Sequence, residues 1–121
     1  HFTGVSSAES VELIRQAKAI NLEVTADVHL SNLLFTEDEV LDFDTNFKLE
    51  PSLRTQKDQD ALWEGLNDGT INGIASDHRP MDTEEKDLEF DLAEFGALQL
   101  QTLFSALMEH PKSNLELVCR I

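Results

Sequence analysis

Short segments that favour β-strands alternate along this chain with longer segments that have the apolar spacing of amphipathic helices. The predicted strands and helices succeed one another at residues 1–6, 7–20, 22–28, 55–67, 71–76 and 91–109. Repeated strand–helix units of this kind form parallel sheets with right-handed crossovers. The pattern therefore predicts an α/β fold of three βα units, which is too few to close a barrel and is about three-eighths of an eight-unit one.

The predicted helices carry the signals that start and end helices. Ser6 followed by Glu9 has the spacing of a capping box in front of the helix over 7–20. Gly69 is expected to end the helix over 55–67, because glycine tolerates a positive φ.

Two segments between the predicted elements have no clean period. Residues 29–54 are expected to form a long loop with one short helix in it, and Pro51 forbids regular structure nearby. Residues 82–91 hold six acidic residues and one lysine, Lys86, and are expected to be a solvated loop.

The chain, residues 1–121, is interpreted as one partial barrel domain with a strongly acidic surface. It carries 24 acidic side chains against 9 basic ones, a net charge of −15 with histidine neutral. Such a charge repels phosphate backbones, so the composition argues against a nucleic-acid partner. No apolar run approaches the roughly 20 residues that span a bilayer, so we expect no membrane segment.

The cysteine content and the first residue bear on the location and the extent of the protein. Cys119 is the single cysteine, so it can form no internal disulfide and no cysteine-based zinc site, and a reducing cytoplasm is expected. The chain begins with His1 in an apolar segment, and we expect it to be part of a longer protein. A three-strand parallel sheet has two open edges, so self-association of this part is expected.

Asp77 is the first candidate for chemistry, because it follows the predicted strand 71–76 directly. In α/β barrels the active-site residues gather at the carboxyl ends of the strands, where an aspartate can be a general base or a metal ligand. The alternative is structural, with Asp77 capping the following turn or pairing with Arg79. His78 could be a ligand or a hydrogen-bonding partner, although adjacent side chains point in different directions.

The histidines are spaced too irregularly to form a metal site by themselves. His110 precedes Pro111 at a predicted helix end, which indicates a structural role. No two histidines have the i, i+4 or His-x-His spacing that places two imidazoles on one metal ion. We therefore expect no tight zinc binding by these residues alone.

Several segments, in order and without large gaps, resemble the dihydroorotase family of metal-dependent amidohydrolases. They are Val-Ser-Ser-Ala-Glu-Ser-Val-Glu-Leu-Ile at 5–14, Val-Thr-Ala-Asp-Val at 24–28, the segment 44–54 ending in Pro-Ser-Leu-Arg, Asp-Gly-Thr-Ile at 68–71, Ala-Ser-Asp-His at 75–78, Glu-Glu-Lys at 84–86 and Phe-Gly at 95–96. The resemblance covers the chain to about Leu107. It implies the C-terminal part of a zinc-dependent TIM-like (β/α)₈ barrel that closes carbamoyl aspartate to dihydroorotate in pyrimidine biosynthesis.

The resemblance implies a role for Asp77 and a defect at Gly4. Asp77 matches the aspartate that ends the last barrel strand, binds metal and acts as general base. The first family motif is His-x-x-His-Val-Ser with its second histidine a metal ligand, whereas this chain has Gly4 at that position. His1 cannot easily substitute for it, because strand positions three apart face opposite sides.

Further family motifs are altered at the positions that resemble an active site. The motif Val-Thr-Pro-His-His-Leu-Leu corresponds to residues 28–34, which lack both of its paired histidines. Glu50 replaces a substrate-contacting asparagine, and Met81 replaces a substrate-contacting histidine in a motif where Arg79 stands for alanine. The added carboxylate is expected to repel a dianionic substrate.

These departures leave two functions open. The first is a dihydroorotase-like protein with impaired or absent catalysis, which has a structural role beside aspartate carbamoyltransferase and needs the remaining part of its own chain. The alternative is an active metal-dependent dihydroorotase or related cyclic amidohydrolase with Asp77 as general base. Metal ligands upstream, such as a His-x-His pair, would favour the second function.

Overall fold

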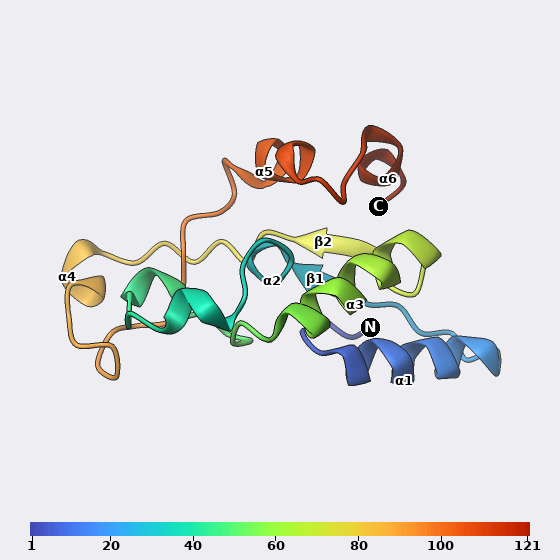
Figure 1. Cartoon of the computed structure of the whole chain (residues 1–121), viewed down its shortest axis with the longest axis horizontal. Coiled ribbons are helices and arrows are strands. Elements are labelled where there is room, and N and C mark those ends of the chain that lie inside the picture. The colour runs from blue at the N-terminus through green and yellow to red at the C-terminus, as the bar shows by residue number, and fades with distance from the viewer.

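Three parallel extended segments lie at the centre of the molecule. The computed structural model describes residues 1–121 and places strands β1 (Asp27–His29) and β2 (Gly73–Ala75) side by side (Figure 1). Val28 pairs with Ile74 in the centre of this two-stranded parallel sheet. On the other edge of β1, the Asp27 amide donates to the Phe2 carbonyl at 3.0 Å. The predicted parallel order of the three strand segments is therefore confirmed, although each is shorter than expected.

Helices α1 (Ala8–Ala19) and α3 (Gln56–Asp68) pack against each other and cover one face of these segments. The N-cap of α1 is Ser7, whose side chain accepts from the Ser10 amide, so the sequence interpretation placed the cap one residue too early. Gly69 ends α3 in the left-handed conformation at φ 81°, as predicted.

A capping box links the start of α3 to the start of α1. The Asp58 carboxylate accepts from the backbone amide of Thr55 at 3.3 Å and from its hydroxyl at 2.6 Å. The other oxygen of Asp58 accepts from the Ala8 amide at 2.8 Å. One side chain thus satisfies free N–H groups at two helix starts, which fixes the two helices relative to each other.

The apolar core lies between the central segments and the helices. Trp63 on α3 is 2% exposed, and its indole N–H donates to the Leu33 carbonyl at 3.0 Å. The other side chains that are almost fully buried are Leu30, Leu33, Leu62, Leu66, Ile71, Leu107, Val11 and Val28. Thirteen buried apolar side chains form one core cluster, to which every predicted strand and helix contributes at least one residue.

The predicted long loop 29–54 contains short helical turns. Helix α2 (Leu30–Leu34) follows β1 immediately, and two 3₁₀ turns follow at Glu37–Val40 and Thr45–Phe47. Leu30 and Leu33 are buried because α2 turns back onto the core, which is why this segment shows no strand-like or helix-like period of useful length.

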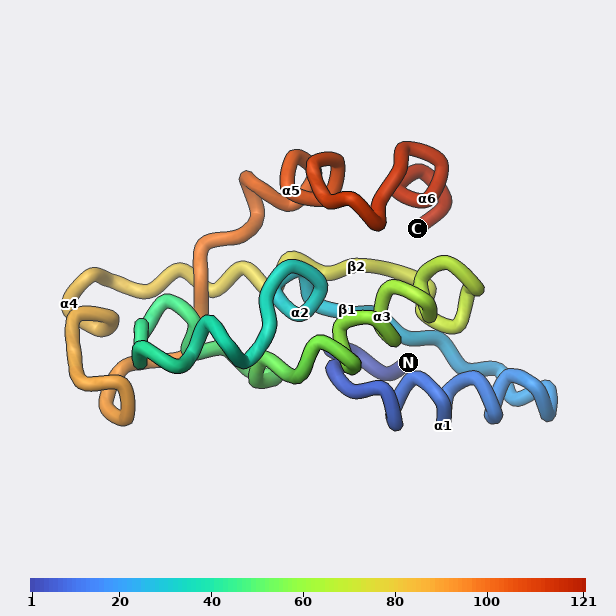
Figure 2. Tube along the Cα trace, in the orientation of Figure 1, coloured from blue at the N-terminus to red at the C-terminus, as the bar shows by residue number.

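The C-terminal third differs most from the sequence interpretation. It contains α4 (Thr83–Lys86), α5 (Leu103–Glu109) and α6 (Leu115–Arg120), and the tube in Figure 2 shows α5 and α6 lying along one side of the molecule. The predicted continuous helix over 91–109 is wrong, because only its last part is helical.

Residues 91–102 use their backbone groups for tertiary contacts in place of a helix. The Gly96 amide donates to the Lys48 carbonyl at 3.1 Å, and the Ala97 carbonyl accepts from the Arg79 amide at 3.1 Å. Gly96 has a φ of 142°, which disfavours a residue with a side chain. These contacts connect the segment to the loops beyond β1 and β2.

The acidic segment 82–91 is tied down by its one lysine. The Lys86 ammonium turns inward and donates to the Thr45 carbonyl at 2.7 Å and the Glu94 carbonyl at 2.9 Å. Burial and then the nearby charge of Lys48 lower the pKa of Lys86 from its ordinary value.

No helix in the structure has the length and apolar character required to cross a membrane.

Candidate functional site

The face of the sheet that α1 and α3 do not cover carries polar side chains. On β1 the side chain of Val28 is in the core, so its neighbours Asp27 and His29 point to the opposite face. Asp77 follows β2 and approaches His29 on the same face, with 3.4 Å between the carboxylate Oδ2 and the imidazole Nδ1. The carboxyl ends of the two strands therefore bring an imidazole and a carboxylate together.

Asp77 also contacts a cation. Its Oδ1 accepts from the Arg79 guanidinium Nε at 3.0 Å, and the Asp77 side chain is only 13% exposed. A guanidinium nitrogen of Arg79 lies 3.7 Å from the Glu50 carboxylate on the other side. The four side chains form a continuous row of contacts in the order His29, Asp77, Arg79, Glu50. The structural interpretation of Asp77, pairing with Arg79, is thus realised in the geometry.

Glu50 lies at the exposed end of this row. Its side chain is 70% exposed and faces Arg79, so water and the guanidinium both screen its charge. The repulsion of a dianionic substrate that the sequence indicates for Glu50 stays a prediction.

Gly4 lies directly beside His29. A Cβ built on Gly4 would lie 3.0 Å from both Cε1 and Nε2 of the His29 ring, and Gly4 has a φ of 67°. The space that a side chain would need at residue 4 is therefore filled by the imidazole from β1. The signal for His29 in the sequence is its place at the end of a predicted strand.

The His1 side chain contacts two other side chains near the start of β1. Its ring nitrogens contact the Thr25 hydroxyl at 2.7 Å and the Asp27 carboxylate at 2.8 Å. The same Asp27 carboxylate accepts from the Thr3 hydroxyl and the Gly4 amide, both at 2.8 Å. His1 and Asp27 thus hold segment 1–4 against β1.

His78 and Met81 make contacts outside the row of His29, Asp77, Arg79 and Glu50. The His78 Nδ1 accepts from the amides of Gln99 at 3.1 Å and Leu100 at 3.3 Å, so this ring orders the segment after Gly96. Met81 borders a hollow of about 200 Å³ that Arg79 and Lys86 also line. Adjacent side chains on this loop therefore contact different parts of the molecule, as predicted.

The segment that resembles the paired-histidine motif is buried. Ser31 and Asn32 are each 3% exposed, and the Asn32 side-chain amide donates to the Ser52 carbonyl at 3.1 Å. Asn32 thereby connects α2 to the 48–54 loop that carries Glu50. Neither Ser31 nor Asn32 supplies an imidazole.

The residues present do not by themselves match the donor set of a catalytic zinc ion. Such a site takes three protein ligands. The structure contains no group of three or more His, Cys, Asp or Glu side chains arranged to hold a metal ion. His29 and Asp77 form a pair of donors, and Arg79 already engages the carboxylate. Whether the chain binds zinc stays a prediction.

Comparison with known sequences identifies the relatives of this chain. No family model matches it. It is 47% identical over 110 residues to the dihydroorotase of Caldicellulosiruptor saccharolyticus, covering 91% of this chain and 26% of that protein. It is 48% identical over 108 residues to the dihydroorotase of Endomicrobium trichonymphae and 44% identical over 110 residues to that of Bacillus subtilis. The chain thus spans about a quarter of the length of these relatives.

Comparison with solved structures gives the same fold. The L-hydantoinase (dihydropyrimidinase) from Arthrobacter aurescens superposes with a TM-score of 0.89 and 27% identity, covering 98% of this chain and 28% of that one. The dihydroorotase from Saccharomyces cerevisiae, solved in complex with 5-fluoroorotic acid, superposes with a TM-score of 0.74 at 18% identity, over 88% of this chain and 30% of that one. The chain is therefore a homologue of the dihydroorotases over about a quarter of their length, with the fold of the matching part of the amidohydrolase TIM barrel.

Proposed function

We propose that this chain is part of a dihydroorotase-like protein of cytoplasmic pyrimidine biosynthesis in which catalysis is impaired or absent. The observation that carries the proposal is the state of Asp77. Arg79 engages one oxygen of this carboxylate at 3.0 Å, and His29 lies 3.4 Å from the other. The Arg79 guanidinium already compensates the negative charge with which Asp77 would bind a metal ion or take up a proton.

The loss of imidazoles at the family ligand positions supports the same proposal. Gly4 and Ser31 stand at positions where the resemblance implies histidines, and Ser31 is buried. The imidazole of His29 fills the space beside Gly4 without adding a third donor at Asp77. Zinc would supply Lewis-acid activation of water in the family, and these residues alone would hold it weakly.

An assembly role gives such a chain a reason to keep its fold. An apolar groove of about 470 Å³ runs between segment 2–6 and α1, and Phe2, Leu13 and Leu22 on its walls are more than half exposed. The backbone edge of segment 2–5 that does not pair with β1 lies beside this groove. We propose that the remaining part of its own chain covers this groove, and that the assembled protein has a structural role with aspartate carbamoyltransferase. Self-association of the isolated 121 residues would follow from the same exposed surface.

The second candidate is an active metal-dependent dihydroorotase or related cyclic amidohydrolase with Asp77 as general base. The observation in its favour is that Asp77 and an imidazole are both retained at the carboxyl ends of β1 and β2. Ligands from outside these 121 residues would then complete the site.

One assay separates the two candidates. The whole protein, unmodified and as Asp77→Ala, is tested for interconversion of carbamoyl aspartate and dihydroorotate with zinc supplied. We expect turnover far below the range of about 1 to 1,000 per second that is typical of enzymes. An ordinary rate that Asp77→Ala abolishes would establish the second candidate. Co-purification of the whole protein with aspartate carbamoyltransferase tests the structural role separately.

A further inference from the structure

We propose that the guanidinium of Arg79 is a built-in counter-cation for Asp77 and takes the charge role of a divalent metal ion at this carboxylate. The inference deepens the proposed function by naming the group that closes the site to a metal ion. It starts from the burial of Asp77, whose side chain is 13% exposed. A carboxylate that is mostly removed from water requires a partner, and Arg79 provides a charge-assisted hydrogen bond at 3.0 Å.

The backbone of Arg79 is held in place by a distant segment. Its amide donates to the Ala97 carbonyl at 3.1 Å, next to the parallel bridge between His78 and Ala97. Gly96 approaches so closely that a Cβ there would lie 2.7 Å from the Arg79 carbonyl oxygen and 2.8 Å from the Arg79 Cβ. The guanidinium is thus carried by a fixed piece of backbone, which lowers the entropy lost when it binds Asp77.

Glu50 makes the arrangement specific for a cation. Arg79 lies between the carboxylates of Asp77 and Glu50, at 3.0 Å and 3.7 Å. The planar fork of arginine can engage carboxylates on two sides, which a lysine ammonium does less well. Both Glu50 and Arg79 differ from the family motifs quoted above, and the structure shows that the two changes are partners in one ion-pair row.

Removal of Arg79 should open this row to a metal ion. Without the guanidinium, the Asp77 carboxylate would lose its paired cation and keep the His29 imidazole beside it, at 3.4 Å. Carboxylate oxygens and an imidazole nitrogen are ligands that divalent transition metals accept. A metal ion and Arg79 therefore compete for the same carboxylate.

The test is a titration of the full chain with Co²⁺, in which binding is measured by calorimetry and by the visible absorption of the bound ion. We expect weak binding by the unmodified chain and a gain in affinity of about tenfold or more in Arg79→Ala. Arg79→Lys keeps the positive charge without the planar fork, so its gain in affinity should be smaller than that of Arg79→Ala. Arg15→Ala is the matched control, because Arg15 also pairs with two acids, Glu12 and Asp68, at 2.8 and 2.7 Å.

A gain in Co²⁺ affinity in Arg79→Ala that is lost when Asp77→Asn is added supports the inference. Equal gains in Arg79→Ala and Arg15→Ala would show only the attraction of cations to an acidic chain, and tight binding by the parent that Arg79→Ala leaves unchanged would overturn the inference. If Arg79→Ala does not fold, the Nε–H exchange rate of Arg79 by NMR decides, since it should rise in Asp77→Asn. An Nε–H rate that Asp77→Asn does not change would overturn the inference. Catalysis is not measured in either experiment, so failure of the proposed function and failure of this inference are distinguishable.

Discussion

The imidazole of His29 lies in the space that a side chain on Gly4 would occupy. A Cβ at residue 4 would be 3.0 Å from Cε1 and from Nε2 of His29, and 3.4 Å from Cδ of Pro51. The φ of 67° at Gly4 adds a second restriction, because residues with a Cβ disfavour the left-handed region. Two positions far apart in the sequence are thus coupled through one small volume.

This coupling predicts an unusually costly glycine substitution. Gly4→Ala should lower the free energy of unfolding by about 2–4 kcal/mol, from left-handed strain and from crowding against the ring. Gly69→Ala is the matched control, since Gly69 has a φ of 81° and no atom within 4 Å of its Cβ position. It should cost only the strain, about 1–2 kcal/mol. Urea denaturation of both variants measures the difference, and equal costs would contradict the coupling.

A second variant tests the coupling directly. His29→Ala should relieve the crowding part of Gly4→Ala, so the double variant should be more stable than the sum of the single changes by about 0.5–3 kcal/mol. Additivity of the two changes would show that His29 yields without cost. The same urea experiments provide this measurement.

Restoring the family residues one at a time should not restore turnover. A histidine side chain at residue 4 would clash with the His29 ring. Glu50→Asn removes the added carboxylate but restores no imidazole, and Met81→His leaves both Gly4 and Glu50 unchanged. We expect no single variant of the whole protein to approach the turnover of a relative with intact motifs. The informative variant combines these three changes with His29→Ala, assayed for dihydroorotate formation. Recovery of ordinary turnover by Gly4→His alone would contradict the prediction.

Asp58 should contribute to stability at neutral pH and lose that contribution in acid. Burial acts to raise its pKa, but hydrogen bonds from Ala8 and Thr55 outweigh burial and hold the pKa below its ordinary value of 3.8. A lowered folded pKa gives stability that is present above the unfolded pKa and lost as the pH falls through the folded one. Asp58→Asn should therefore cost about 1–2 kcal/mol near pH 7.

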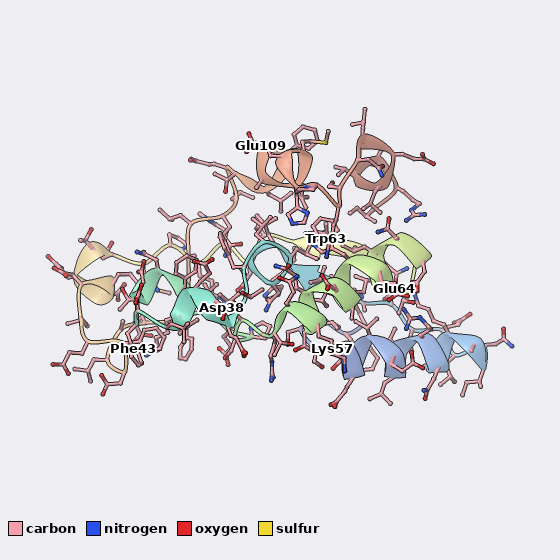
Figure 3. All side chains as sticks on the ribbon, in the orientation of Figure 1. Asp38, Phe43, Lys57, Trp63, Glu64 and Glu109 are labelled. Atoms are coloured by element: carbon pink, nitrogen blue, oxygen red, sulfur yellow. The ribbon has the colours of Figure 1, made fainter.

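The acid dependence provides the check on Asp58. The difference in unfolding free energy between the parent and Asp58→Asn should narrow as the pH is lowered below the ordinary aspartate range. Glu64→Gln, an exposed change on the same helix α3, is the control and should have little effect at either pH (Figure 3). A constant difference across the pH range would show that the charge of Asp58 is not what stabilises the helix starts.

His110 should make the protein less stable as the pH falls below neutrality. Its ring stacks on Trp63 with the centroids 4.5 Å apart, and burial, then the nearby charge of Lys112, lower its pKa from the ordinary 6.5. A base with a lowered folded pKa stabilises the fold fully above the unfolded pKa, and that contribution is lost as the pH falls below it.

The variant His110→Phe isolates this effect. Phenylalanine keeps an aromatic ring against Trp63 and cannot take up a proton. Its unfolding free energy should fall less than that of the parent between about pH 7.5 and 5.5. Chemical denaturation at the two pH values gives the comparison, and an identical loss in both proteins would assign the pH dependence to other groups.

Much of the fold could be predicted from local sequence signals. Helices α1 and α3 have regular apolar spacing and clear end signals, and the structure places them within one or two residues of the prediction. The helix over 91–109 was overextended because Leu92 and Leu100 continue the apolar spacing, yet both are more than 60% exposed. Spacing could not reveal that the backbone groups of Gly96 and Ala97 bond to Lys48 and to Arg79.

The sequence by itself determined the alternating βα order, the charge and the family of relatives, because these depend on residues close together or on motifs read in order. The tertiary structure decided how the candidate site is used. Asp77 was identifiable at the end of its strand, but its contacts with Arg79 and His29 depend on the bend of the loop after β2 and on the register of β1 beside it. The contact between Gly4 and His29 likewise depends on tertiary structure, because the His29 ring fills the volume that a side chain at residue 4 would need. Such volumes are set by packing between segments, and no local pattern encodes them.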